Sequence, residues 1–400
     1  MQCEKYRSWP KFSLSIDGLL VRFWRNLVMA CALKNFLSSS LCAGGLVRGL
    51  LLLLFLVLGW NPPTLANTIC TPSLTNPARS TNPHPPYQLI NLGPRFAEFW
   101  QQAQDKPFLE QLALWDQLIE MPNQRFYDAM VWNKIDPDWF FTKYERLEAF
   151  FGELAHDPTL LKGMIQEFAR FEENVAANTA RFIKYFSDAS FPQVIYAAPA
   201  ITFNGKANRD LVVGFGIDRI VALNQYDFQR NSNVLYTHEF FHIYHARASQ
   251  MTRYARAQAS NSAEFYLWRE GLATYFSQFM NPGTTEVEAL GSQELDQISD
   301  DGVYWLAAKF LAETSRNQNW HAHWFNYYES SPDGPDLPAR CGYLLGLRVA
   351  QIIAQFYSGQ EMAHWNPLQA QAIVRDALKI LANRNKSPKK PANFYRENNR

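Results

Sequence analysis

The chain has 400 residues, of which 47% are hydrophobic, 19% charged and 15% aromatic. This composition excludes a disordered or fibrous protein and allows a sizeable core in one large or two modest domains. The net charge of +1 argues against a polyelectrolyte partner such as a nucleic acid. The charge is unevenly placed, because residues 1–66 carry seven basic and two acidic side chains, a net of +5, which leaves −4 for residues 67–400.

The N-terminus has the features of an export signal. Residues 49–60 form an uncharged apolar run, GLLLLLFLVLGW, with a basic flank before it and the small residue Ala66 soon after it. The run is shorter than the roughly 20 apolar residues that a spanning helix needs. It predicts a signal peptide over residues 1–66, with an uncleaved membrane anchor as the alternative and Met29 as an alternative start to Met1. Either reading predicts an exported protein, periplasmic or extracellular, and an anchor would hold it at the membrane.

Two of the five cysteines, Cys70 and Cys341, lie beyond this leader. In an oxidising compartment the two could form a disulfide. They could equally be two unrelated thiols, since a sequence does not give the Cα separation that a disulfide requires.

The rest of the chain divides by composition into four parts. Residues 67–94 are rich in proline and predict a linker. Residues 95–190 repeat apolar positions at helical spacing and predict a helical N-terminal part. Residues 191–383 begin with β-branched segments and turn signals, then become helical. They predict an α+β fold, mainly helical, with a small antiparallel sheet that precedes the helices. Residues 384–400 predict a basic, flexible tail.

The motif that carries chemistry is HEFFH at residues 238–242. On a helix, positions i and i+4 share one face, so His238 and His242 can reach the same metal ion. Glu239 is offset by about 100° of helix rotation, which places its carboxylate beside the metal, where it can take a proton from water. A random chain of this length contains the pattern about once in a hundred cases. The alternative is a buried helix with two hydrogen-bonded histidines.

A third ligand has to come from outside this motif. The longer pattern HExxHxxGxxH needs Gly and His where His245 and Ala248 stand. Glu270 is the candidate, because it lies in an apolar helical segment, WREGLATYF, where a carboxylate needs a partner. Zinc would be that partner and would keep an open position for water. A surface ion pair with Arg269 is the alternative explanation of this glutamate. Other acids could serve as the ligand: Glu264, Glu286 and Glu288.

HEFFH followed by EGLATY resembles the gluzincin metallopeptidases, a group that includes thermolysin and aminopeptidase N. The closest likeness is to largely uncharacterised bacterial predicted zinc-dependent proteases, in which a C-terminal helix with Tyr and Gly follows, as in CGYLLGLRV here. The resemblance covers about residues 190–355, and the gap between His242 and Glu270 is longer than in thermolysin. It implies a zincin-like fold in which the small antiparallel sheet precedes the HExxH helix. It also implies that both motif histidines, His238 and His242, and Glu270 bind Zn²⁺, that Glu239 is the general base, and that Tyr343 stabilises the oxyanion.

Several supporting roles follow from the same stretch of sequence. Tyr343 competes for the oxyanion role with His321, His323 and Arg340, and it could instead be a core tyrosine. Gly346 would allow its helix to approach another helix closely. Thr274 could orient Glu270 from the next turn. By resemblance, residues 210–216 could be an edge strand that aligns a peptide by main-chain pairing.

Three functions therefore compete. The first is an exported zinc metallopeptidase, a hydrolase that cleaves peptide or protein substrates with a zinc-activated water and Glu239 as the base. The second is a non-catalytic, zinc-stabilised binding or scaffolding protein anchored at the membrane. The third is a membrane-tethered interaction protein whose histidines only pack. Glu239 favours the first, because a structural zinc site needs no base and is closed by four protein ligands.

Overall fold

The computed structural model describes residues 87–132, 134, 139–189, 191–208, 212–223, 228–249, 262–314, 320–325, 337–385 and 389–396. The chain divides into two compact units, residues 1–81 and 82–400, and all described residues belong to the second. The predicted leader, its apolar run and Cys70 lie outside the described residues. Across the part that the structure describes, no helix is long and apolar enough to cross a membrane.

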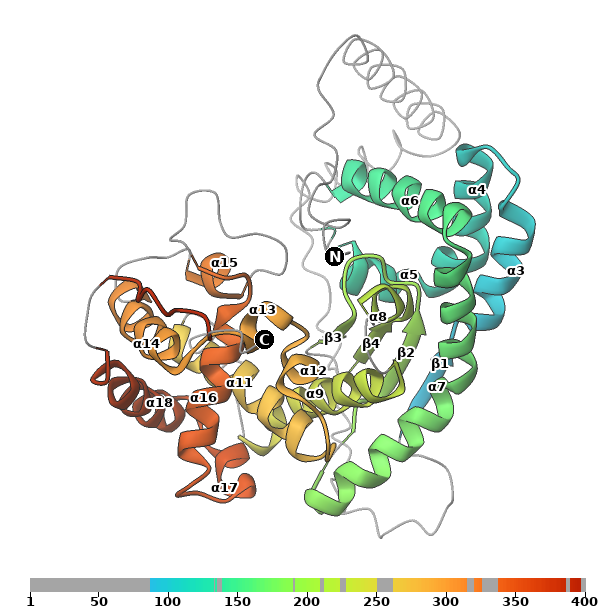
Figure 1. Cartoon of the computed structure of the whole chain (residues 1–400). Helices are drawn as coiled ribbons and strands as arrows, with labels where there is room; N and C mark the ends of the chain where they lie inside the picture. The colour runs from blue at the N-terminus through green and yellow to red at the C-terminus, as the bar shows by residue number, and fades with distance from the viewer. Residues whose placement is uncertain are drawn as a thin grey trace, which may run out of the picture. The chain divides into compact units, whose positions relative to one another are not determined.

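The N-terminal part of the described chain is helical, as the apolar spacing predicts (Figure 1). Its helices are α3 (Gly93–Ala103), α4 (Phe108–Trp115), α5 (Gln124–Phe126), α6 (Trp139–His156) and α7 (Pro158–Tyr185), with short π-helical and 3-10 turns between α4 and α6. The start of the long helix α7 is set by two residues, Asp157 and Pro158. Asp157 caps it by accepting hydrogen bonds from the backbone N–H groups of Thr159 and Leu160, and Pro158 occupies its first turn.

A four-stranded sheet precedes the HExxH helix, but it is mixed rather than antiparallel. Its strands are β1 (Gln88–Asn91), β2 (Val194–Ala198), β3 (Gly205–Ala207) and β4 (Val212–Gly216), in the order β1-β2-β4-β3. The strands β1, β2 and β4 are parallel, and only β3 runs antiparallel to β4. The predicted antiparallel sheet is wrong because β1 comes from the end of the predicted linker at residues 67–94 and reaches β2 through the helices α3 to α7.

The predicted edge strand, residues 210–216, is not at the edge. Its described part, β4, lies between β2 and β3, so β3 is the edge strand beside it. Within β4, a Cβ at Gly214 would lie 2.7 Å from the ring of Phe126. The absence of a side chain at Gly214 therefore serves packing inside the protein.

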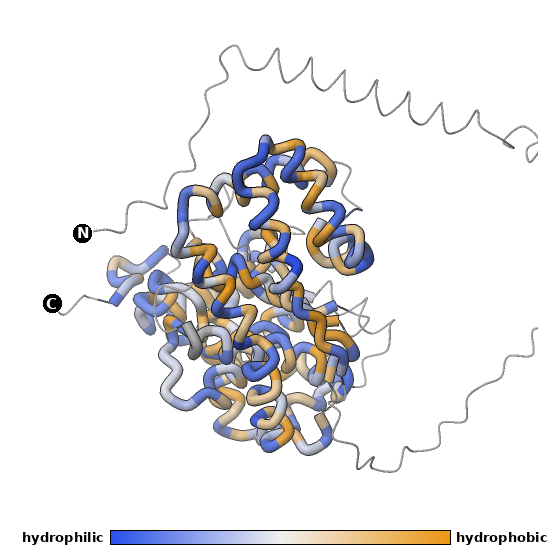
Figure 2. Tube along the Cα trace, turned by 90° about the vertical axis from the view of Figure 1, so that its right-hand side faces the viewer, coloured by the Kyte–Doolittle hydropathy of each residue, from blue (hydrophilic) through white to orange (hydrophobic). Residues whose placement is uncertain are grey.

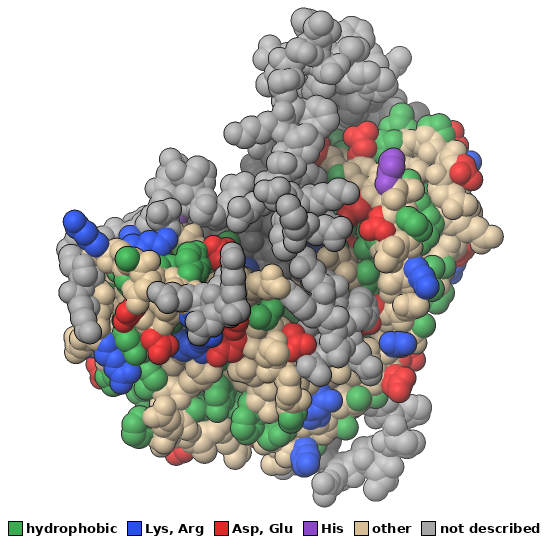
Figure 3. Space-filling view, viewed as in Figure 1, with side chains coloured by type: hydrophobic (Ala, Val, Ile, Leu, Met, Phe, Trp, Pro, Cys, Tyr) green, Lys and Arg blue, Asp and Glu red, His purple; other side chains and the backbone are tan. Residues whose placement is uncertain are grey.

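The C-terminal part is built from helices around α11 (Ala263–Phe279). The others are α9 (Phe228–Ala248), α12 (Glu286–Leu290), α13 (Gln293–Asp296), α14 (Asp300–Thr314), α15 (Trp320–Phe325), α16 (Cys341–Ile353), α17 (Gly359–His364) and α18 (Pro367–Ala382). Helix α8 (Ile217–Leu223) instead packs against α7 and the sheet. Helix α11 packs against both α9 and α16. Apolar and polar residues alternate along these helices (Figure 2), as expected where each buries one face. On the face shown in Figure 3, acidic and basic side chains are interspersed.

The predicted flexible tail, residues 384–400, is anchored over its described part. Phe394 is buried and packs edge-on against Trp305, with ring centroids 5.7 Å apart. The backbone N–H of Ser299 donates to the carbonyl of Phe394, and Tyr395 forms a bridge with Ile298. The basic composition of the tail obscured this one apolar anchor.

Cys341 is a buried thiol at the start of α16. Its predicted disulfide partner Cys70 lies outside the described residues, so the disulfide stays a prediction.

Candidate metal centre and active site

The two motif histidines lie on one face of α9, as their spacing predicts. The Nε2 atoms of His238 and His242 are 3.0 Å apart. The side chains of Phe240 and Phe241, on the other faces of the same turn, are buried in the core. Core packing of these two rings fixes the rotation of α9, which turns both imidazoles toward α11.

Glu270 on α11 completes the group. Its Oε2 atom lies 3.5 Å from Nε2 of His238 and 3.3 Å from Nε2 of His242. For bonds of 2.0–2.1 Å in a tetrahedral site, neighbouring ligand atoms are about 3.3 Å apart. The separations in this protein match that value, and the three residues form a group that could hold a metal ion. Burial lowers the pKa of His238 to about 4, so its imidazole is in the neutral form that binds metals.

A glycine pair brings the helix of Glu270 into place. A Cβ at Gly346 on α16 would lie 2.6 Å from the carbonyl oxygen of Leu267 and 2.8 Å from the Cα of Gly271, both on α11. This confirms the predicted close approach at Gly346. Because Glu270 precedes Gly271 and Tyr343 stands one turn before Gly346, the crossing places both side chains at the same site.

Arg269 also binds Glu270, on the carboxylate oxygen that faces away from the histidines. Its Nε and Nη2 atoms donate to Oε1 of Glu270 at 3.1 and 2.8 Å. The sequence predicts either an ion pair of Glu270 with Arg269 or an approach of Glu270 to the histidines, and the structure contains both. Thr274, predicted to orient this side chain, instead donates its hydroxyl to the backbone carbonyl of Glu270 at 2.8 Å.

The rival acids are engaged elsewhere. Glu264 pairs with Arg375, and Glu286 forms a two-pronged ion pair with Arg348, both bonds measuring 2.7 Å. Glu288 closes a capping box at the start of α12. Across the described residues, the only group of three or more potential ligands that converges is the one formed by the two histidines and Glu270.

Glu239 lies beside this group, under the edge strand β3. Its carboxylate accepts a hydrogen bond from the backbone N–H of Ala207. Gly205, two residues earlier in β3, leaves room for it, since a Cβ at this position would lie 2.8 Å from Oε1 of Glu239. Burial raises the pKa of the Glu239 carboxyl to about 7. A carboxylate with such a pKa can both accept and return a proton near neutral pH.

Tyr343 lies on the α16 side of the group, with its ring centroid 6.4 Å from that of His238. Burial raises the pKa of its phenol well above the usual value, so the hydroxyl stays a donor. Arg340 stacks on this ring at 4.3 Å and donates to the carbonyl of Leu290. His323 pairs instead with Glu313 at 2.6 Å.

His321 contacts the ring of Tyr266 at 4.5 Å and does not line the cleft. Tyr266 itself does line the cleft and was missed, because its segment reads as an apolar core helix. Arg269 stacks on the Tyr266 ring at 4.4 Å. The cleft therefore holds a second phenol besides Tyr343, on the same helix as Glu270.

The group of two histidines and Glu270 lines one cleft together with Glu239, Tyr266 and Tyr343. The cleft has a volume of about 720 Å³, in the range of small-molecule and peptide pockets. One wall is β3 with the loop before it, and the floor is α9 and α11. The opposite wall comes from α12, the residues that follow it, and the start of α16.

The loop before β3 is held in an unusual conformation. Ile201 has φ of 62°, a left-handed conformation that is rare for a β-branched residue. The buried carboxylate of Asp218 accepts hydrogen bonds from the N–H groups of Ala200 at 2.7 Å and Ile201 at 2.9 Å. Burial raises the pKa of Asp218 to about 6. These bonds offset the backbone strain and fix the entry of the chain into β3.

No protein-family model matches the chain, and no curated protein or solved structure shows detectable similarity to it. The fold is a mostly helical α+β arrangement with a mixed sheet before α9.

Proposed function

We propose that this protein is an exported, zinc-dependent metallopeptidase that hydrolyses peptide bonds. The observation that carries the proposal is the convergence of His238, His242 and Glu270 at the floor of an open cleft, with Glu239 beside them. Two imidazoles and one carboxylate suit zinc. Three protein ligands leave the fourth position open, as in catalytic rather than structural sites.

The metal would supply electrophilic chemistry: when bound, zinc polarises a carbonyl group and lowers the pKa of water toward neutrality. The chain supplies the proton transfers. Glu239 takes the proton of the attacking water and passes it to the leaving nitrogen. The N–H of Ala207 orients the Glu239 carboxylate, and the absence of a side chain at Gly205 lets it lie under β3.

Tyr343 is the donor proposed for the oxyanion that forms during attack. Its phenol stays protonated, it lies next to His238, and Arg340 holds the ring from its outer face. Because its hydroxyl is neutral and protonated, the phenol can donate a hydrogen bond to the oxyanion without a change in its own ionisation. Arg340 is close enough to add its positive charge.

The edge strand β3 is proposed to align the peptide. Asn204 and Asn208 make their backbone hydrogen bonds to β4, at Gly216 and Val212. Pairing alternates along an antiparallel strand, so the backbone groups of Gly205 and Ala207, on either side of Lys206, point away from β4 into the cleft. Their N–H groups already donate to Oδ1 of Asn204 and to Glu239, so their carbonyl oxygens are the groups left to accept from a peptide. An extended peptide could add to this edge by β-augmentation.

The test is Glu239→Gln in the zinc-loaded protein, with exposed Glu153→Gln on α6 as the matched control. We expect Glu239→Gln to keep zinc and fold but to lose 10²- to 10⁴-fold in peptide hydrolysis, the usual contribution of a general base. The control should behave as wild type. Equal turnover by wild type and Glu239→Gln in a peptide-library assay would overturn the proposal. Full zinc occupancy without turnover in wild type would favour a non-catalytic zinc protein instead.

A further inference from the structure

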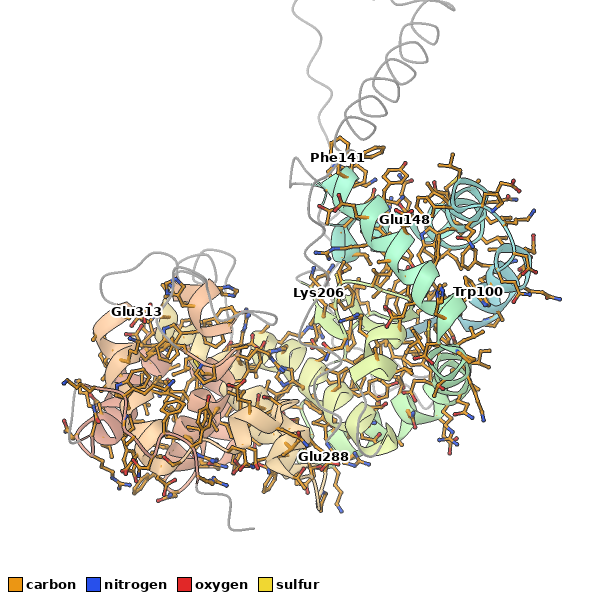
Figure 4. All side chains as sticks on the ribbon, turned by 45° about the horizontal axis from the view of Figure 1, so that its top comes forward. Trp100, Phe141, Glu148, Lys206, Glu288 and Glu313 are labelled. Carbon is orange, nitrogen blue, oxygen red and sulfur yellow. The ribbon has the colours of Figure 1, made fainter. Side chains whose placement is uncertain are left out.

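The cleft wall at β3 contains a cation, Lys206, that has no carboxylate partner among the described residues. Lys206, the middle residue of β3, lines the cleft, and Figure 4 shows it between the N-terminal helices and the C-terminal helices. Its Nζ donates to the backbone carbonyl of Met130 at 2.7 Å and lies 5.6 Å from the ring centroid of Phe203. Among the described residues, no carboxylate comes within ion-pair distance of this ammonium group.

The surroundings of Lys206 make its charge costly. The side chain is half-buried, and burial lowers the pKa of its ammonium group, while the nearby charge of Glu239 only partly offsets this. A cation held by a neutral carbonyl and an aromatic ring gains more from a carboxylate than a solvated surface lysine does.

The position of Lys206 in the sheet determines where such a carboxylate could come from. The residue paired with Lys206 on β4 is Gly214, which has no side chain. The other side of Lys206 is the free edge of β3, with which none of the described strands pairs. In paired strands, directly opposed side chains have Cβ atoms about 4.5–5.5 Å apart on the same face. A peptide residue added to the free edge opposite Lys206 would therefore lie within reach of its ammonium group.

The remaining charges of the cleft point the same way. Among the described residues that line it, the basic side chains are Lys206, Arg219, Arg269 and Arg340, and the acidic ones are Glu239, Glu270 and Glu288. Glu270 is already shared between Arg269 and the histidines. Lys206 is the basic side chain on the edge strand itself, where a positive charge favours a ligand of the opposite sign.

We propose that the cleft selects peptides that place a Glu or Asp side chain opposite Lys206 on the free edge of β3. This inference rests on the proposed function for the identity of the ligand as a peptide. It assigns Lys206 as a specificity-determining residue for acidic substrates.

The experiment measures peptide binding to the zinc-loaded Glu239→Gln protein, so that binding is separated from turnover. The probes are blocked, apolar hexapeptides with a fluorescent label, in which each position in turn carries Glu, Gln or Lys. We expect one position at which the Glu peptide binds at least tenfold tighter than its Gln counterpart, with a preference that weakens as salt is added. Lys206→Gln should abolish the preference, and Lys206→Glu should shift it toward Lys at that position.

Lys379→Gln is the control, because this lysine lies on α18 outside the cleft lining and its side chain is 57% exposed. It should keep the full preference. Equal binding of Glu and Gln peptides at every position, or a preference that survives in a folded Lys206→Gln protein, would overturn the inference. Hydrolysis by wild type without charge preference would contradict this inference and leave the proposed function standing. Charge-dependent binding without any hydrolysis by wild type would contradict the proposed function and leave this inference standing.

Discussion

Gly205→Ala is the substitution that probes the placement of Glu239 most sharply. The added Cβ would lie 2.8 Å from Oε1 and 2.9 Å from Cγ of Glu239, and 2.9 Å from Cδ1 of Leu235. Both neighbours are side-chain ends that can move, so we expect Glu239 to leave the N–H of Ala207 while β3 keeps its place. The stability cost should be about 1 kcal/mol, as for an ordinary substitution.

The activity cost should be far larger than the stability cost. A displacement of about 1 Å in a catalytic group costs about 100-fold in rate. That factor corresponds to about 2.7 kcal/mol of transition-state stabilisation. None of the three proposed metal ligands is among the nearest neighbours of the new Cβ, so zinc affinity should stay within a few-fold of wild type.

The assay is kcat/KM on a peptide substrate, with zinc content and melting temperature measured on the same samples. Gly152→Ala on α6 is the matched control, because nothing lies within 4 Å of a Cβ there, and it should keep full activity. Wild-type activity in Gly205→Ala would refute the inferred position of Glu239. Loss of zinc together with activity would show that β3 supports the metal group rather than the base.

Three further predictions concern other parts of the site. Gly346→Ala should push α16 from α11, because its Cβ would meet backbone atoms, and should lower the stability by about 1–3 kcal/mol in denaturant unfolding; an unchanged midpoint would contradict the tight helix crossing. Glu270→Gln should weaken zinc binding by more than about 100-fold in a competition titration, which is more than the loss of a residue that only hydrogen-bonds to a ligand would cost. Glu264→Gln should leave zinc binding unchanged, and the reverse result would identify another ligand. Burial raises the pKa of Asp218 to about 6, above its value in the unfolded chain. Its protonation should therefore stabilise the fold fully below about pH 4, and this contribution, at most about 3 kcal/mol, should be lost as the pH rises through 6. Asp218→Asn should remove this dependence from denaturant midpoints measured between pH 4 and 7, and exposed Asp376→Asn should keep it; an identical pH profile in Asp218→Asn would contradict the assignment.

Much of the candidate site could be predicted because its chemistry is local. The spacing of His238 and His242 needs only a helix to bring them together. Glu270 stood out as a carboxylate in an apolar segment, and Gly346 as a small residue in the helix of Tyr343. These expectations concern residues whose meaning depends on a single helix or on one helix crossing, and the structure places them together.

What the sequence could not show depends on contacts between distant segments. The parallel pairing of β1 with β2 joins residues about a hundred positions apart, and the prolines around β1 favoured a linker. The edge strand is β3 rather than residues 210–216 because β4 pairs with β2 on one side and with β3 on the other. Tyr266 reads as part of an apolar core helix, because its place in the cleft depends on what α9 and α16 place opposite it. Phe394 anchors a tail whose other residues are typical of a solvated end.

The central claim is that His238, His242 and Glu270 hold one zinc ion. The most direct measurement is the metal content of the full chain purified without chelators, by inductively coupled plasma mass spectrometry, beside a folded His242→Ala variant. The account predicts close to one zinc per wild-type chain and almost none in the variant. Wild-type protein without near-stoichiometric zinc, or with zinc that remains in His242→Ala, would contradict it.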